Sequence, residues 1–370
     1  MYRPFTLLLA ATAAFPALAQ EQPQPVQSPE VHADRTVTFR FRDPNAQEVL
    51  LSLEGTKRKP MQKDERGVWS LTTEPLEPDY YSYSFVADGV GLLDPANPLR
   101  VPNLLSADSE VHVAGASLPW EVSNVPRGAV HHHFYKSEVV GDERDFYVYT
   151  PPGYDGSAKK LYPVLYLLHG YSDDASAWTA VGRANVILDN LIAVGKAKPM
   201  LIVMPLGYGA PEILNRTSPA FRDANLRLRN MDRFRGALFT EVMPQVEKTY
   251  RVAKDRSQRA IAGLSMGGAE SLYTGLNAVD RFAWIGAFSS GGMGDEFNGM
   301  FPALDSKTSS QLRLLWIACG TDDHLIEVNR KFRDWLTSKG VRFTPVETPG
   351  AHNWMVWRRN LPVFASLIFQ

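Results

Sequence analysis

The stretch that decides the fold is Ile261-Ala262-Gly263-Leu264-Ser265-Met266-Gly267-Gly268. It contains the pattern Gly-x-Ser-x-Gly, preceded by small apolar residues and followed by a helical pattern. In this context the pattern predicts a sharp strand-to-helix turn, with a strained serine whose hydroxyl stands above the sheet. Gly263 and Gly267 are expected because a Cβ would clash in so tight a turn. We therefore predict that Ser265 is a nucleophile and that the Met266 N–H faces an oxyanion. The alternative is a glycine-rich structural turn.

An acid and a histidine follow the serine in the order that this kind of site requires. The apolar run 314–319 predicts a strand buried on both faces, and Asp322 and Asp323 lie just beyond it. Open α/β sheets place their sites at the carboxyl ends of such strands. Asp323 is the preferred acid, and Asp322 is the alternative. His352 follows a short predicted strand at 343–348, where its imidazole can reach both the serine and the aspartate.

A second junction between a strand and a loop supplies the other part of an oxyanion site. The apolar run 164–168 predicts a buried strand that leads into His169-Gly170-Tyr171. The turn after such a strand donates the second backbone N–H in α/β-hydrolases, and we assign this donor to Tyr171. His169 is expected to brace the loop by hydrogen bonds. His324 is interpreted as a loop residue, because it is too close in sequence to Asp323 to complete the triad from an opposite loop.

Beyond residue 130, apolar strands alternate with helical stretches. This order is the βαβ pattern of a mostly parallel sheet with helices on both faces, and it predicts the α/β class with an α/β-hydrolase fold. The chain has no internal repeats. The predicted strands are 164–168, 200–205, 259–262, 284–288 and 314–319, and the predicted helices include 186–194, 234–249 and 269–276.

The N-terminal part has short strands separated by Gly, Pro and Asp. Residues 36–41 alternate at period two, and 49–53, 68–72 and 80–86 are further short strands. This spacing predicts an all-β sandwich of the immunoglobulin-like type that ends near residue 113. The predicted organisation is a signal peptide at 1–19, a flexible Gln/Pro-rich linker at 20–30, the sandwich at 31–115, a Pro-containing linker at 116–130 and the α/β-hydrolase domain at 131–370.

The first residues predict export. Arg3 carries a positive charge, residues 5–15 are apolar or small, and Ala17-Leu18-Ala19 fits a small-x-small cleavage site. Together they indicate a secretory signal peptide, with an uncleaved anchor as the alternative. The apolar run is too short to span a bilayer stably. No later segment is long and apolar enough, so we expect a secreted or periplasmic protein with no membrane span.

Composition and charge exclude several classes. The chain has 370 residues and a formal net charge of −1, which argues against nucleic acid as a partner. Its one cysteine, Cys319, excludes an internal disulfide and is expected to be a small buried hydrophobe. The run His131-His132-His133 cannot converge on one metal ion, because neighbours in a strand point to opposite faces. We predict no metal and no cofactor. A basic run predicts a solvated helix face, with contact to a substrate carboxylate as the alternative: Arg222, Arg227, Arg229, Arg233 and Arg235.

From about Phe134 to its end the chain resembles the putative esterase family, which includes carbohydrate esterase family 1 and esterase D. In this resemblance the family's acid maps to Asp323, and Ala351 departs from the second glycine that is common before the histidine. Trp178 and Trp354, within the matching motifs, are candidate substrate-binding residues. The motifs are Tyr149-Thr150-Pro151-Pro152-Gly153-Tyr154, Leu167-Leu168-His169-Gly170 with Trp178, Val203-Met204-Pro205, Gly263-Leu264-Ser265-Met266-Gly267-Gly268, Cys319-Gly320-Thr321-Asp322-Asp323 and Gly350-Ala351-His352-Asn353-Trp354.

The N-terminal sandwich resembles early-set domains close to family 48 carbohydrate-binding modules, which often precede esterases of this family. Trp69 and Tyr81 offer flat apolar faces on which a sugar ring can stack, as do Tyr80 and Tyr83. At least half of these aromatic residues are expected to fill the core instead. The matching pieces are Gly67-Val68-Trp69-Ser70, Pro78-Asp79-Tyr80-Tyr81-Ser82-Tyr83 and Asp94-Pro95-Ala96-Asn97-Pro98.

These features together predict an exported serine carboxylester hydrolase that uses Ser265, His352 and Asp323. The resemblance implies feruloyl or acetyl esters on plant cell-wall polysaccharide (xylan) or on acylated oligosaccharides. A siderophore esterase of the enterobactin type and an acyltransferase are the alternatives. The oligomeric state is left open. Because the triad lies beyond residue 260, the sandwich is expected to be dispensable for hydrolysis of a small ester, unless one of its aromatic residues lines the cleft.

Overall fold

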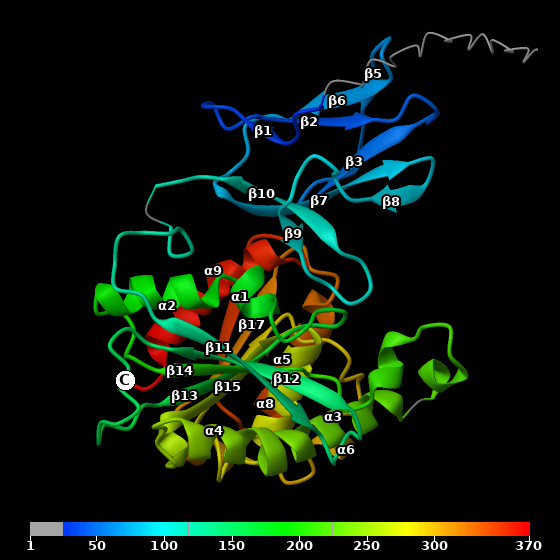
Figure 1. The fold of residues 1–370 in the computed structure, drawn as a ribbon. Coiled ribbons are helices and arrows are strands. Elements are labelled where there is room, and N and C mark those ends of the chain that lie inside the picture. Colours follow the sequence, from blue (N-terminus) through cyan, green and yellow to red (C-terminus); the bar gives the residue numbers. More distant parts are fainter. Residues whose placement is uncertain (1–24, 117, 224) are drawn as a thin grey trace, which may run out of the picture.

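An N-terminal pair of antiparallel sheets lies next to a domain built on a larger, mostly parallel sheet (Figure 1). The computed structural model describes residues 25–116, 118–223 and 225–370. The predicted signal peptide and the first part of the predicted linker, residues 20–24, lie outside the described residues. No helix within the described ranges combines the length and the apolar character that a bilayer crossing requires.

The N-terminal sheets form the predicted all-β sandwich. Phe39 and Phe41 of one sheet face Tyr83 and Phe85 of the other, with ring centroids 4.7–4.9 Å apart, and all four are buried. Alternate residues of each strand enter this core, as a half-buried sheet requires. One sheet has the order β1 (Glu30–Val31), β2 (Val37–Arg42), β6 (Val68–Thr72) and β5 (Gln62–Lys63); the other has β4 (Lys59–Pro60), β3 (Val49–Leu53), β7 (Asp79–Ala87), β10 (Asp108–Val113) and β9 (Arg100–Val101), with β8 (Val90–Leu92) beside β7.

Parts of both predicted linkers make defined contacts in the structure. Strand β1 starts at Glu30, and the Ser28 hydroxyl accepts a hydrogen bond from the Arg40 N–H at 3.1 Å. In the second linker, Trp120 is buried against the core of the large sheet, and the first strand of that sheet begins at Ala129. Polar and proline-rich composition predicts a loose segment, but it does not reveal a single aromatic anchor or a pairing at a sheet edge.

The large sheet has eight strands in the described chain, and its parallel part carries the predicted α/β pattern. Strands β14, β13, β15, β16, β17 and β18 are parallel, whereas β11 and β12 pair antiparallel at one edge. Strands β11 and β12 were not predicted from the sequence. The order is β11 (Ala129–Lys136), β12 (Glu143–Thr150), β14 (Leu201–Pro205), β13 (Val164–Leu168), β15 (Arg259–Leu264), β16 (Trp284–Phe288), β17 (Leu314–Gly320) and β18 (Thr344–Thr348).

Helices cover both faces of this sheet (Figure 1). In β13 the side chains alternate: Leu165 and Leu167 pack with the cluster of α2 (Ala184–Ala193) and α9 (Trp354–Leu367). Tyr166 and Leu168 pack on the opposite side. That side is covered by α3 (Leu226–Ala237), α4 (Met243–Thr249), α5 (Met266–Leu276) and α8 (Ile326–Ser338), with a π-helical segment, Leu238–Val242, joining α3 to α4. Short helices are α1 (Ala177–Ala180), α6 (Phe297–Met300) and α7 (Thr308–Gln311), and 3₁₀ turns lie at Pro211–Leu214, Pro219–Arg222 and Arg256–Gln258.

Candidate active site

The turn between β15 and α5 has the strained geometry that the sequence predicts. Ser265 has φ 51° and ψ −115°, in the positive-φ region that L-residues avoid. A Cβ on Gly263 would lie 2.4 Å from the Gly267 carbonyl oxygen, and a Cβ on Gly267 would lie 2.3 Å from the His169 carbonyl oxygen. Both glycines are therefore needed for the close approach of the backbone. The Ser265 N–H donates to the Phe288 carbonyl at 2.8 Å, which ties the turn to the neighbouring strand.

The structure brings Ser265, His352 and Asp323 together from three separate loops. Nε2 of His352 lies 3.0 Å from the Ser265 hydroxyl, and Nδ1 lies 2.8 Å from Oδ2 of Asp323. Because the carboxylate is an acceptor, Nδ1 carries the proton, and Nε2 accepts from the serine hydroxyl. The Asp323 side chain is fully buried and the His352 side chain is 20% exposed. The arrangement can take up the serine proton and hold the resulting imidazolium.

Asp323 is held as a carboxylate by its neighbours. Burial raises the pKa of this carboxyl. The hydrogen bond and the charge interaction with His352 lower the pKa, and so does the N–H of Leu325, which donates to Oδ1 at 2.8 Å. The lowering outweighs the effect of burial, so the pKa lies below the ordinary value. Asp322, the alternative acid, is exposed, and its carboxylate reaches the Thr321 hydroxyl at 3.5 Å instead of the histidine. The geometry thus favours Asp323.

The loop after β13 is braced by His169, as predicted. The Gly207 N–H donates to Nε2 of His169 at 2.8 Å, so Nδ1 must carry the proton and donate to the Gly170 carbonyl at 2.8 Å. Burial lowers the pKa of His169 to about 4 and keeps the ring neutral. Tyr171 follows in the same loop. Among the backbone hydrogen bonds of turns and loops in the described residues, none is donated by the N–H of Tyr171 or of Met266. Both N–H groups are therefore available to a substrate oxygen near Ser265.

A hollow of about 440 Å³ opens beside Ser265 and extends over the α5 side of the turn. Its wall is mostly apolar, and it contains two cationic side chains, Arg216 and Arg227. The Tyr171 hydroxyl donates to the Ile213 carbonyl at 3.0 Å and accepts from Nε of Arg216 at 3.1 Å, which fixes one side of the wall. The lining residues are Tyr171, Ile213, Arg216, Phe221, Arg227, Asn230, Met231, Ser265, Met266, Gly291, Gly292 and Leu325.

A second hollow, of about 300 Å³, lies on the other side of Ser265 and is lined by His352 and Trp354. Two of its residues, Glu54 and Ser82, come from the N-terminal sandwich. Glu54 was not predicted from the sequence. It is a single glutamate at the end of a short strand, 300 positions from its partner Trp354, and nothing in the local sequence indicates the contact.

Three of the four candidate substrate-binding aromatic residues have buried rings, which offer no open face to a substrate. Trp178 is fully buried below the site, and its Nε1–H donates to the Leu168 carbonyl at 2.9 Å. Trp69 and Tyr81 fill the sandwich core, with polar atoms bonded to the carbonyls of Asp43 and Glu77. Tyr80 and Tyr83 are buried too. Large rings pack inside whenever their polar atom finds a partner. Trp354 is also mostly buried, at 7% exposed, but it lines the second hollow and stays a candidate contact.

The other polar clusters have local partners. The three consecutive histidines of β11 contact Thr150, Asp145 and Tyr250 separately. In the basic run, Arg227 lines the 440 Å³ hollow, and the side chain of Arg222 lies outside the described part. The other three arginines have local partners: Asp223 and Glu212 for Arg229, backbone carbonyls for Arg233, and Asp232 for Arg235. Within the described ranges, one group offers three metal-ligand atoms within 4.8 Å of one another, namely Asp323, His324 and His352, and two of these already bond to each other.

The comparisons with known proteins agree with this geometry. The model of a family described as putative esterase matches residues 137–366. The "Endo-1,4-beta-xylanase/feruloyl esterase" of Xylanibacter ruminicola is 28% identical over 356 residues, which is 94% of this chain and 47% of the relative. This chain thus spans about half the length of that relative. The "Acetyl esterase" of Caldicellulosiruptor saccharolyticus is 22% identical over 229 residues, 53% of this chain and 79% of the relative.

Solved structures extend the likeness to both parts of the chain. A ferulic acid esterase from the anaerobic fungus Anaeromyces mucronatus superposes with a TM-score of 0.57 and 26% identity, covering 67% of this chain and 93% of that one. The enterobactin esterase of Shigella flexneri superposes with a TM-score of 0.65 and 20% identity, covering 90% and 92%. The second likeness concerns the fold alone, and it includes the N-terminal region.

Proposed function

The chain belongs to the putative esterase family, and on this premise we propose that it hydrolyses feruloyl or acetyl esters on plant cell-wall polysaccharide such as xylan, or on acylated oligosaccharides cut from it. The observation that carries the proposal is the hydrogen-bonded series Ser265–His352–Asp323, with Ser265 lining a 440 Å³ hollow. A nucleophile, a base and an orienting acid in contact, beside a pocket, are the parts that acyl transfer requires.

In this proposal the reaction has two halves. The Ser265 oxygen bonds to the ester carbonyl carbon while its proton passes to Nε2 of His352. The N–H groups of Tyr171 and Met266 hold the negative oxygen. The bond from carbon to the alcohol oxygen then breaks, and His352 returns the proton to that oxygen. A water molecule then attacks the carbonyl carbon of the acyl-serine and gives one proton to His352. The bond from that carbon to the Ser265 oxygen breaks, His352 returns the proton to the serine oxygen, and the acid leaves.

The 440 Å³ hollow supports an aromatic acyl group over acetyl. Its wall of Tyr171, Ile213, Phe221, Met231 and Leu325 suits a planar ring, whereas an acetyl group would leave most of the volume empty. The names of the relatives, a feruloyl esterase and a ferulic acid esterase among them, support the same choice. We therefore place feruloyl esters first and acetyl esters second.

A siderophore ester of the enterobactin type is the second candidate. Arg216 and Arg227 in the hollow favour it, because they offer positive charge to an anionic aromatic group. An acyltransferase would use the same triad and differ in the acceptor that attacks the acyl-serine.

The setting of the enzyme completes the proposal. The predicted signal peptide at 1–19 favours a secreted or periplasmic location, where polymeric substrate is found. We propose that the sandwich is an immunoglobulin-like early-set domain related to carbohydrate-binding modules. Because its candidate stacking rings are buried, any contact with sugar uses other residues. The proposed units are the linker at 20–30, the sandwich at 31–115, the linker at 116–130 and the esterase domain at 131–370.

A release assay tests the function. Purified enzyme is incubated with methyl ferulate, feruloylated xylan, acetylated xylan and enterobactin, and the acid products are separated by chromatography. Release of ferulate at a higher kcat/KM than release of acetate supports the first choice. Fast hydrolysis of enterobactin with none of the plant esters would replace it with the siderophore reading, and no hydrolysis of any ester would remove the proposal.

A further inference from the structure

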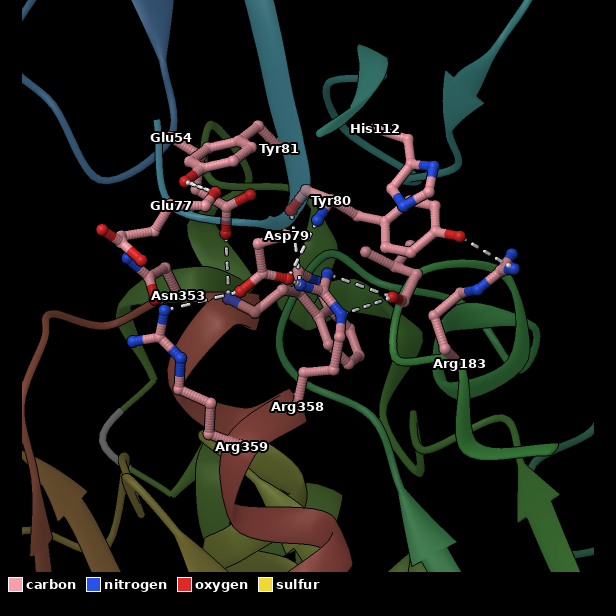
Figure 2. Close-up of polar contacts among 12 residues, drawn as sticks. Glu54, Glu77, Asp79, Tyr80, Tyr81, His112, Arg183, Asn353, Arg358 and Arg359 are labelled. Carbon is pink, nitrogen blue, oxygen red and sulfur yellow. Dashed lines mark hydrogen bonds and ion pairs between the residues drawn. The ribbon is translucent and has the colours of Figure 1, made fainter. Parts of the chain in front are cut away.

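The first turns of helix α9, which follow His352 directly, are held by the N-terminal sandwich (Figure 2). The Arg358 guanidinium is buried and is bonded to the Asp79 carboxylate and to the carbonyls of Tyr80 and Val181. Met355, one turn earlier, packs against the sandwich core. A helix anchored in this way cannot move independently of the sandwich.

Glu54 adds a contact at the N-terminus of α9, next to the histidine. Oε1 of Glu54 accepts the Trp354 N–H at 3.0 Å, and Oε2 accepts the N–H and the hydroxyl of Ser82 at 3.0 and 3.1 Å. The side chain of Asn353 accepts the Val356 N–H at 3.2 Å. The first turn of a helix leaves backbone N–H groups without intrahelical partners. Here one of them is taken by a residue from the other domain, and a carboxylate also suits the positive end of the helix.

The loop that carries His352 is therefore fixed on both sides. Before the histidine, the Gly350 carbonyl accepts the Asp322 N–H at 2.9 Å. After it, the chain turns into α9 at Trp354, where Glu54 holds the backbone. Glu54 also lines both the hollow that contains Ser265 and His352 and an adjoining hollow of about 510 Å³ that continues over the sandwich. An error in the position of a catalytic group by about 1 Å costs roughly 100-fold in rate.

We propose that Glu54 is a positioning residue for the hydrolysis, acting through the Trp354 N–H to set His352 against Ser265. The inference rests on the proposed function, since it assigns a role in the same site. It also reverses the expectation that the sandwich is dispensable for a small ester. The sandwich is then part of the catalytic unit, through a polar contact and not through an aromatic residue in the cleft.

The test compares Glu54→Ala with Glu65→Ala, which removes an exposed glutamate from the same domain. Both are assayed on 4-nitrophenyl acetate and methyl ferulate, with thermal unfolding to confirm that each is folded. For Glu54→Ala we expect kcat and kcat/KM to fall together by about 10- to 100-fold on both esters, with KM little changed. Glu65→Ala keeps the wild-type values. Glu54→Gln, which still offers an oxygen to the Trp354 N–H, falls between wild type and Glu54→Ala.

Different failures have different meanings. A folded Glu54→Ala enzyme with wild-type kcat overturns the inference, and so does a rise in KM on methyl ferulate alone, which would indicate substrate contact instead. If Glu54→Ala does not fold, Glu54→Gln decides: a kcat equal to wild type overturns the inference, and a lowered kcat with unchanged KM supports it. Ser265→Ala must also lose the hydrolysis of both esters. If it does not, the proposed function fails and the inference fails with it.

Discussion

Asp79→Asn should destabilise the whole protein, because it leaves a charged group buried without its counter-ion. The side chains of Asp79 and Arg358 are 0% and 1% exposed, and they are paired across the contact between the sandwich and α9 (Figure 2). Arginine keeps its charge at any accessible pH. Asparagine has nearly the same shape as aspartate, so the substitution removes the negative charge and little of the packing.

The structure sets the size of the effect. Removing one partner of a buried ion pair typically costs about 3–5 kcal/mol. Arg358 retains the Val181 carbonyl, which accepts from Nε and Nη2 at 3.3 and 3.2 Å, and the Tyr80 carbonyl at 3.3 Å. These acceptors offset part of the loss, so we expect a decrease near the lower end, about 3 kcal/mol. Arg359, 3.6 Å from Asp79 and 35% exposed, serves as the control, and Arg359→Met should cost about 0–1 kcal/mol.

The assay is urea unfolding followed by both tryptophan fluorescence and circular dichroism, since coincident transitions test for a single cooperative unit. Asp79→Asn, Arg358→Met and the double variant form a cycle. The double variant should be less destabilised than the sum of the two single variants by about 2 kcal/mol or more, because the unpaired charge is absent from it. An Asp79→Asn protein within about 0.5 kcal/mol of wild type would refute the buried pair.

Three further predictions concern the site. Asp323→Asn should lower kcat by about 10⁴-fold through the wrong histidine tautomer, and Asp322→Asn far less; the opposite ranking in steady-state kinetics would give the role to Asp322. The pKa of His169 is about 4 in the folded protein and about 6.5 in the unfolded chain, so the stability that depends on its neutral form is complete above pH 6.5 and about 3 kcal/mol of it is lost as the pH falls to 4. In urea unfolding, His169→Gln should therefore lose less stability than wild type over this pH range. An equal loss in the two proteins would contradict the assignment. Gly267→Ala should abolish ester hydrolysis and lower the free energy of unfolding by about 1–3 kcal/mol, because its Cβ would meet backbone at 2.3 Å; an active variant with wild-type stability would show that the turn can shift.

The parallel core of the fold could be predicted from sequence because its central strands are apolar throughout. The runs at 164–168 and 284–288 match β13 and β16 to the residue. Ser265, Asp323 and His352 follow from that frame, since each lies just beyond the carboxyl end of a strand. The edge strands β11 and β12 were missed because they lack such a run: β11 is largely exposed and carries the histidines, and β12 begins with three charged residues.

Contacts between distant segments could not be predicted in this way. The motif that contains Trp178 indicates its place in the chain, but its burial depends on α1 packing beneath the site against Trp354 and Phe288. Glu54 and Arg358 each look like ordinary surface charges in their own segments. Their roles appear only when the sandwich and α9 are brought together, and no local pattern records that arrangement.

The central claim, ester hydrolysis through an acyl group on Ser265, is tested most directly by trapping the nucleophile. The enzyme is treated with an alkyl fluorophosphonate, which bonds to activated serines, and then digested for peptide mass mapping, with turnover of methyl ferulate followed in parallel. We predict one adduct, on the peptide that contains Ser265, with loss of turnover in proportion to labelling, and neither adduct nor turnover in Ser265→Ala. Labelling at another serine, or a Ser265→Ala enzyme that hydrolyses methyl ferulate at the wild-type rate, would contradict the account.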